Sequence, residues 1–274
     1  PRTTLLGVPS ALQFNFNNQV HVLPSKADSL FWIKSAGFIL RRGILIKKHE
    51  KILGVGNVVE LVLKFLLKLK FKRQIIRAVG VGDTVLDIKK SRNLLLGYFQ
   101  TDNWLTDPYV LQTLQSMEIT GGKEIIEFYS VKAAEENPLI VHLRIGDYKN
   151  EPDIGLLPSE YYHRALSEFA KLEDVRNIWL FSDEPEIALD KMPQSLKSRT
   201  EIITIPENND ALTLQVMRLG KNYILSNSTF GWWAARLSCS ADPTVLVPDR
   251  WFKALPEPEG LIPEKWVRIH AWEA

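Results

Sequence analysis

The second half of the chain, from about Leu139 onward, alternates short apolar runs with helical patterns. The apolar runs are LIVHL (139–143), NIWLFS (177–182), EIITI (201–205), NYILS (222–226) and TVLVP (244–248). Between them lie stretches of helical periodicity at 159–172, 184–192, 210–220 and 230–238. Five buried strands separated by four helices are typical of a parallel sheet with crossover helices. We therefore expect an α/β fold with a Rossmann-like domain over residues 136–274.

The first half of the chain gives a weaker pattern. Candidate strands lie at GFILR (37–41), GILIKK (43–48) and NLLLGYF (93–99), and candidate helices around 57–69, 105–118 and 123–134. With 274 residues, the chain has room for two compact domains of roughly 100–150 residues each. We expect a second α/β domain over residues 1–135.

Composition favours a soluble, globular protein, because 45% of residues are hydrophobic and 24% are charged. The single cysteine, Cys239, cannot form an internal disulfide, so nothing in the sequence requires an oxidising compartment. No uncharged apolar run approaches the roughly 20 residues that span a bilayer, and the first residues lack a signal-peptide pattern. These features predict a cytoplasmic protein.

Positive charge is concentrated in one part of the chain. Residues 41–77 contain eleven Lys or Arg against two Glu, although the whole chain has a net charge of only +2. The segment 60–79, ELVLKFLLKLKFKRQIIRAV, interleaves apolar residues with six of these cations. It could be a helix packed on the domain with a solvated basic face, or it could contact an anionic membrane surface. No known nucleic-acid-binding motif accompanies the charge, so we expect no nucleic-acid partner.

Polar residues follow three of the predicted strands at their carboxyl ends, where ligands of open parallel sheets bind. They are His142, Arg144, Gly146 and Asp147 at the end of the first strand; Ser182 and Asp183 at the end of the second; and Ser226, Asn227, Ser228 and Thr229 at the end of the fourth.

These residue types suit an anion such as a diphosphate. Arg144 offers a charged planar fork that matches phosphate oxygens, and Gly146 lets the backbone approach a ligand. Ser228 and its neighbours can cap the helix that begins near Phe230, whose free N–H groups favour an anion. Asp183 could accept hydrogen bonds from a sugar or a base. Simpler readings also remain open: a plain helix cap, a local salt bridge between Arg144 and Asp147, and a core position for His142.

Three motifs carry a family resemblance. HLRIGDY (142–148), FSDE (181–184) and SNSTFGWWAARL (226–237) resemble the alpha-1,2-fucosyltransferases, whose bacterial members build surface polysaccharide. GYFQTDNW (97–104) also looks like a segment of that family, and the resemblance covers about residues 94–250. Trp232 and Trp233 of the third motif fit a protein core better than a ligand platform.

The resemblance implies a GT-B-like fold of two Rossmann-like domains, with GDP-fucose bound to the C-terminal one. It implies inverting transfer of L-fucose, without metal, to a galactose-type hydroxyl of a glycan that could be lipid-linked at the inner face of the cytoplasmic membrane. Arg144 and Asp147 are then the candidate catalytic residues. The donor-binding candidates are His142, Gly146, Ser182, Asp183, Ser226, Asn227, Ser228 and Thr229. A non-catalytic module that binds a nucleotide sugar or a glycan is the alternative.

The sequence departs from the family pattern in two places. The family usually has a Gly-Gly-Leu-Gly-Asn-Gln loop after its first strand, and no such stretch occurs here. We therefore expect an incomplete N-terminal domain. Many relatives also place a second arginine directly after the first, where this chain has Ile145. No cluster of His, Cys or carboxylate residues has convincing metal-ligand spacing, which agrees with a metal-free site.

Overall fold

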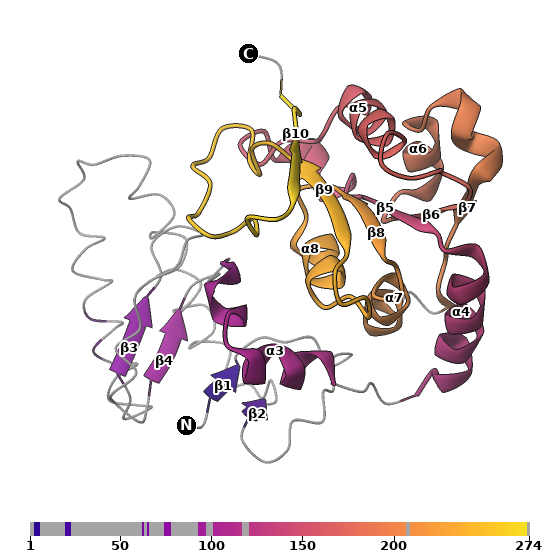
Figure 1. Ribbon diagram of the computed structural model, residues 1–274. Helices are drawn as coiled ribbons and strands as arrows, with labels where there is room; N and C mark the ends of the chain where they lie inside the picture. The colour runs from indigo at the N-terminus through magenta and orange to yellow at the C-terminus, as the bar shows by residue number, and fades with distance from the viewer. Residues whose placement is uncertain are drawn as a thin grey trace. The chain divides into compact units, whose positions relative to one another are not determined.

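The computed structural model describes residues 101–116, 121–206 and 209–272. It also describes the strand backbones at 3–5, 20–22, 74–77 and 93–96 and the helical positions Val62 and Phe65 (Figure 1). The chain divides into two compact units, residues 1–104 with 258–262 and residues 105–257 with 263–274.

The boundary between the units falls at residue 104 rather than at the expected residue 135. The helices α3 (Pro108–Gln115) and α4 (Lys123–Glu136) both belong to the second unit. Glu136 of α4 accepts a hydrogen bond of 2.7 Å from the indole N–H of Trp179, and the backbone carbonyl of Gln115 accepts one of 2.8 Å from Arg218. These contacts attach the two helices to the rest of the second unit.

The second unit contains a sheet of six parallel strands in the order β10-β9-β8-β5-β6-β7. The strands are β5 (Leu139–Leu143), β6 (Ile178–Ser182), β7 (Thr200–Ile202), β8 (Asn222–Leu225), β9 (Thr244–Pro248) and β10 (Val267–Ile269). The α/β class is confirmed, and a strand is present at each of the five expected runs. The third strand, however, is Thr200–Ile202 and not residues 201–205. Strand β10 is additional. Its sequence, VRI, is too short to give a pattern.

The strand order determines where at the edge of the sheet a ligand can bind. The chain moves from β5 to β6 and β7 on one side, and then to β8, β9 and β10 on the other. Such a reversal opens a crevice between the two central strands at their carboxyl ends. His142 pairs in register with Phe181 of β6 and Leu225 of β8, so it lies beside this crevice.

Side chains of β5 alternate between the two faces of the sheet. Leu139, Val141 and Leu143 pack in a core cluster with the buried side of α5 (Ser159–Phe169) and with Ala188 of α6 (Pro185–Asp190). The other face is covered by α4, α7 (Asp210–Met217) and α8 (Thr229–Arg236) (Figure 1). His142 belongs to this second face, which explains why it meets α8.

The helix α5 shows how sequence periodicity determines the packing. Its buried side chains are Tyr161, Tyr162, Ala165, Leu166 and Phe169, a spacing that puts all five on one side of the helix. Burying a side chain as large as Phe169 contributes about 1.5–3 kcal/mol to the free energy of unfolding.

In its described residues, the first unit contains two parallel strand pairs. Strand β1 (Thr3–Leu5) pairs with β2 (Val20–Val22), and β3 (Gln74–Arg77) pairs with β4 (Asn93–Leu96). The strand expected at 93–99 is therefore present over its first four residues. The strands expected at 37–41 and 43–48 lie outside the described residues, and a second complete Rossmann-like domain stays a prediction.

The basic segment 60–79 is not one helix. Val62 and Phe65 are helical and exposed, but Gln74–Arg77 is strand β3. A packed helix is therefore the wrong reading for residues 74–77, where pairing with β4 prevails over helical periodicity. The other positions of the segment lie outside the described residues. None of the helices in the described part of the chain is long and apolar enough to cross a bilayer.

Candidate functional site

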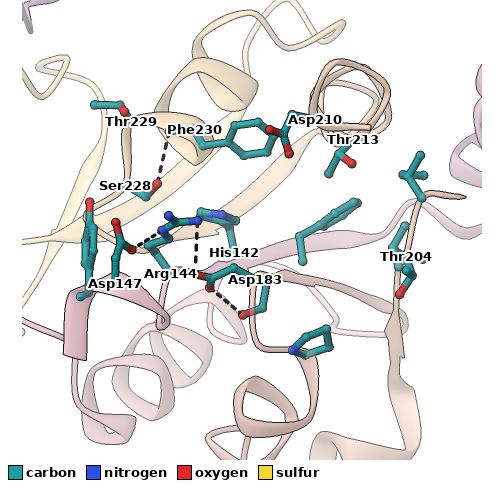
Figure 2. A pocket seen from close by; sticks show the side chains of 16 residues that line it. His142, Arg144, Asp147, Asp183, Thr204, Asp210, Thr213, Ser228, Thr229 and Phe230 are labelled. Carbon is teal, nitrogen blue, oxygen red and sulfur yellow. Dashed lines mark hydrogen bonds and ion pairs between the residues drawn. The ribbon is translucent and has the colours of Figure 1, made fainter. Parts of the chain in front are cut away.

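A pocket of about 640 Å³ lies at the carboxyl ends of the central strands. Its volume is within the range of pockets that bind small molecules. It is lined by His142, Arg144, Asp147, Tyr148, Phe181, Ser182, Asp183, Pro185, Ile203, Thr204, Ile205, Asp210, Thr213, Ser228, Thr229 and Phe230 (Figure 2). Seven of the ten residues expected at the site therefore share one pocket.

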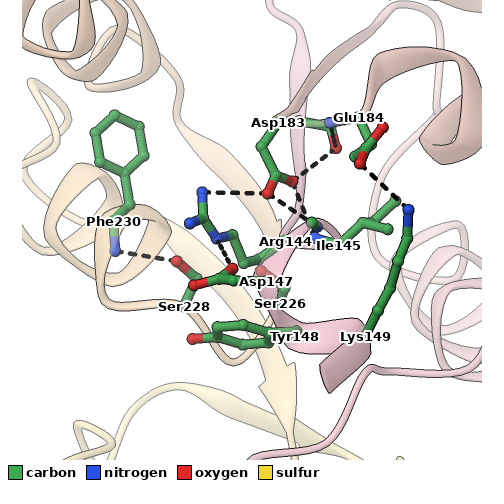
Figure 3. Close-up of polar contacts among 12 residues, drawn as sticks. Arg144, Ile145, Asp147, Tyr148, Lys149, Asp183, Glu184, Ser226, Ser228 and Phe230 are labelled. Atoms are coloured by element: carbon green, nitrogen blue, oxygen red, sulfur yellow. Dashed lines mark hydrogen bonds and ion pairs between the residues drawn. The ribbon is translucent and has the colours of Figure 1, made fainter. Parts of the chain in front are cut away.

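Arg144 is the cation of this pocket. Its Nε donates a hydrogen bond of 2.8 Å to Oδ1 of Asp147, and its Nη1 lies 3.2 Å from Oδ2 of Asp183 (Figure 3). The side chain remains 38% exposed. The two carboxylates therefore orient the guanidinium while part of it still faces the pocket. Both the predicted salt bridge and a position suited to anion binding are present.

Asp183 fixes the loop that carries Arg144. Its carboxylate accepts hydrogen bonds from the backbone N–H of Ile145, at 2.9 Å, and of Gly146, at 3.0 Å. A Cβ atom at position 146 would lie 2.7 Å from Oδ2 of Asp183, closer than real contacts allow. Gly146 is thus required by the approach of the protein's own carboxylate, and it does not line the pocket. Ser182 assists by accepting a hydrogen bond of 3.1 Å from the N–H of Glu184.

His142 is buried and also lines the pocket. Its Nδ1 lies 3.1 Å from Oγ of Ser226, and Gly231 leaves room for the ring, since a Cβ there would lie 2.8 Å from Nδ1. Burial lowers the pKa of His142 to about 4, with a smaller lowering by Arg144 and an opposing effect of Asp183. The imidazole is therefore neutral near pH 7 and can act there as a hydrogen-bonding group but not as a cation.

The N-terminus of α8 forms another wall. Ser228 is the N-cap, and its Oγ accepts a hydrogen bond of 3.3 Å from the N–H of Phe230. Ser228, Thr229 and Phe230 all line the pocket. The positive end of the helix dipole therefore lies at the same pocket as Arg144, an arrangement that suits a phosphate group.

Ser226 and Asn227 lie behind this wall, and neither side chain lines the pocket. Ser226 bonds to His142, as described above. Asn227 donates hydrogen bonds to the carbonyls of Ile154, at 3.2 Å, and Gly155, at 3.0 Å. Tyr148 donates one of 3.2 Å to the carbonyl of Asn227. These contacts support a positioning role for both residues, and direct contact with a ligand stays a prediction.

One side of the pocket was not foreseen from the sequence. Ile203, Thr204 and Ile205 follow β7, and Asp210 and Thr213 belong to α7. Asn209 caps α7 by accepting a hydrogen bond of 3.1 Å from the N–H of Leu212. The position of EIITI as a strand in the same sheet was the available signal, because its carboxyl end must reach the same edge.

The pocket has two chemically different ends. Figure 2 shows Asp147, Ser228 and Thr229 at one end and Thr204, Asp210 and Thr213 at the other, with Arg144 and His142 between Asp147 and the far end. An elongated ligand with a central anionic group would fit this arrangement. Among the residues that the structure describes, no group of three or more His, Cys, Asp or Glu could hold a metal ion.

Comparisons with known proteins agree with the motifs. The family model described as Glycosyl transferase family 11 matches residues 85–269, more than half of the chain, and confirms the resemblance. The O-antigen biosynthesis glycosyltransferase WbnK of Escherichia coli is 26% identical over 193 residues, covering 66% of this chain and 62% of the relative. An alpha-1,2-colitosyltransferase of Escherichia coli is 30% identical over 143 residues, or 48% of each chain.

This chain thus spans between about half and 62% of the length of these curated relatives. Among solved structures, POFUT1 in complex with GDP matches with a TM-score of 0.38 and 12% identity. That match covers 58% of this chain and 56% of the other, and at such a TM-score it carries no weight for fold or function.

Proposed function

Because this chain belongs to glycosyl transferase family 11, we propose that it transfers a deoxy sugar, L-fucose from GDP-fucose, to a galactose-type hydroxyl of a glycan. The proposed linkage is alpha-1,2, formed with inversion and without metal. One observation supports the proposal most strongly. Arg144 and the N-terminus of α8 line the same pocket as Asp210, a carboxylate that can accept hydrogen bonds from a base.

The proposed binding mode follows from the two ends of the pocket. Asp210, which lines the same pocket as the apolar side chains of Ile203 and Ile205, can accept hydrogen bonds from the N1–H and the amino group of guanine. The diphosphate then lies against Arg144 and the first N–H groups of α8. A neutral His142 adds a hydrogen bond without adding charge.

The proposed reaction places the largest demand on Arg144. The acceptor hydroxyl attacks the anomeric carbon, the bond from that carbon to the diphosphate oxygen breaks, and the electron pair leaves with GDP. Arg144 and α8 stabilise this growing negative charge, and a contact of that kind contributes about 3–4 kcal/mol to the transition state.

Asp147 serves this step by orienting Arg144, to which it is bound at 2.8 Å. In an inverting attack the acceptor hydroxyl arrives on the face opposite the diphosphate, whereas Asp147 is bound to Arg144, the residue proposed to hold the diphosphate. We therefore assign Asp147 a positioning role and leave the general base unassigned.

The test is to incubate the protein with GDP-fucose and a panel of galactosides, and to measure GDP release and the new glycosidic linkage by NMR. A parallel reaction uses colitose carried on the same nucleotide, because one relative is an alpha-1,2-colitosyltransferase. Transfer of either sugar supports the proposal. Tight donor binding without transfer to any acceptor would instead support the alternative, a non-catalytic nucleotide-sugar or glycan-binding module.

We also propose a location at the inner face of the cytoplasmic membrane, where a lipid-linked acceptor would be found. The support is the segment 60–79, whose six Lys or Arg would attract anionic lipids at roughly 1 kcal/mol each. Co-sedimentation with anionic but not neutral vesicles, lost on changing Lys64, Lys68, Lys70 and Lys72 to Gln, is the expected result. Failure of the unchanged protein to bind anionic vesicles at low salt would contradict it.

A further inference from the structure

Tyr148 lies at the end of the pocket that the base and the diphosphate leave unoccupied in the proposed binding mode. In the proposed binding mode the base occupies the Asp210 end and the diphosphate lies against Arg144 and α8. A nucleotide diphosphate sugar is a linear molecule, so its sugar must extend past the diphosphate, away from the base. The residues there are Asp147, Tyr148 and Thr229.

The ring of Tyr148 is held in a fixed position at this end. Figure 3 shows it beside Ser226, Ser228 and Asp147, on the far side of Arg144 from Asp183. Its hydroxyl donates to the carbonyl of Asn227 at 3.2 Å, and Asn227 is itself bonded to the 154–155 backbone. Burial raises the pKa of Tyr148, so the hydroxyl keeps its proton and remains a donor. The hydroxyl is therefore occupied, and the ring is the part available to a ligand.

We propose that Tyr148 is the platform for the transferred sugar, with its ring packed against the apolar C6 methyl side of a 6-deoxy sugar. An aromatic ring offers a large, rigid apolar surface, which suits a methyl group better than a hydroxymethyl group. The neighbouring Asp147 is 60% exposed and can accept a hydrogen bond from a sugar hydroxyl while it holds Arg144. This inference rests on the proposed function and names the residue that selects the sugar.

The competing explanation is structural: Tyr148 could only brace the loop that leads into α8. The two roles differ in which ligand is affected. Loss of a brace weakens binding of the diphosphate and therefore of GDP itself. Loss of a sugar platform leaves GDP binding unchanged and affects only donors that carry the sugar.

The experiment compares Tyr148→Leu and Tyr148→Phe with the unchanged protein. Calorimetry gives the Kd for GDP, and steady-state kinetics give kcat/KM for GDP-L-fucose and for GDP-L-galactose, which differs from it only by a hydroxyl at C6. A matched control is Tyr109→Leu, since Tyr109 is 76% exposed on α3 and does not line the pocket.

For Tyr148→Leu we expect a Kd for GDP within about twofold and a fall in kcat/KM for GDP-L-fucose of about 10-fold or more, with reduced preference over GDP-L-galactose. Tyr148→Phe keeps the ring and should retain most of that preference. An equal loss of GDP binding and transfer, or no loss of either, would overturn the inference while leaving the proposed function standing. If the unchanged protein neither binds GDP nor transfers a sugar, the proposed function fails and the inference falls with it.

Discussion

The two ends of the pocket are built from different parts of the sheet and from different kinds of side chain. The Arg144 end combines the loop after β5 with the N-terminus of α8, and it is crowded with charge and hydrogen bonds. The Asp210 end combines the residues after β7 with α7, and among the described residues Asp210 is the one carboxylate there, in a lining of isoleucine and threonine side chains. The Arg144 end therefore suits a charged group of a ligand, and the Asp210 end suits a part of the ligand that is recognised by its shape.

This difference has a physical origin. A doubly charged group needs a cation, oriented donors and carboxylates that orient the cation, so several residue types are fixed at once. A base can be recognised by apolar contacts and one acceptor, which many sequences supply. Substitutions at the charged end are therefore expected to have the largest effects.

Replacing Arg144 by Lys should have the largest effect. Lysine keeps the charge but loses the planar fork, so kcat for sugar transfer should fall about 100- to 1,000-fold while the fold stays intact. Arg176→Lys is a matched control, because Arg176 is 80% exposed and pairs only locally with Asp174. Turnover like that of the unchanged protein in Arg144→Lys would remove Arg144 from the site.

The pH dependence of folding should reveal the buried His142. Its pKa is about 4 in the folded protein, below the ordinary value of 6.5, so the unfolded chain binds more protons between these values. Stability from this group is complete above pH 6.5 and declines as the pH falls towards 4, by up to about 3 kcal/mol. Urea unfolding at pH 7 and pH 4.5 should show a smaller decline for His142→Gln. An NMR titration of the ring in the unchanged protein provides a second measurement, and a pKa near 6.5 would contradict this account.

Changing Asp210 to Asn tests the other end of the pocket. If its carboxylate reads guanine, the preference for GDP over inosine diphosphate, which lacks the amino group, should drop by roughly 10-fold in Asp210→Asn. Binding of the diphosphate part should be unaffected, in contrast to changes at Arg144. Asp242→Asn is the control, since Asp242 is exposed and pairs with Lys265. An unchanged preference would remove Asp210 from base recognition.

Chelation of metal should have the smallest effect. If Arg144 and α8 neutralise the diphosphate, transfer in EDTA should stay within about twofold of the rate without it. The rate with added Mg²⁺ or Mn²⁺ is the companion measurement. A strict requirement for either ion would show that the Arg144 end does not act alone.

The same contrast explains what the sequence could and could not predict. Strands β5, β6, β8 and β9 were foreseen over nearly their full length because of their apolar runs, and Arg144, Asp183 and Ser228 because they follow three of those strands at the edge of the sheet where ligands bind. Thr204 and Asp210 were missed because a Thr in a run expected to be a strand and an Asp at a helix start usually have structural roles. In the structure β7 ends at Ile202, so Thr204 lies beyond the strand.

The motifs also could not predict which of their residues face the pocket and which are buried behind it. Ser226 and Asn227 belong to the same motif as Ser228, yet a turn of the backbone puts them behind the pocket wall. Gly146 was expected to make room for a ligand and instead makes room for Asp183. Such distinctions depend on three-dimensional contacts between loops that are far apart in the sequence.

A crystal structure of the protein with bound GDP would show whether this pocket holds a nucleotide and in which direction. We expect the diphosphate between the Arg144 guanidinium and the first N–H groups of α8, the guanine against Asp210, and an open end beside Tyr148. A GDP molecule bound in the reverse direction, with its base beside Tyr148, or bound outside this pocket, would contradict this expectation.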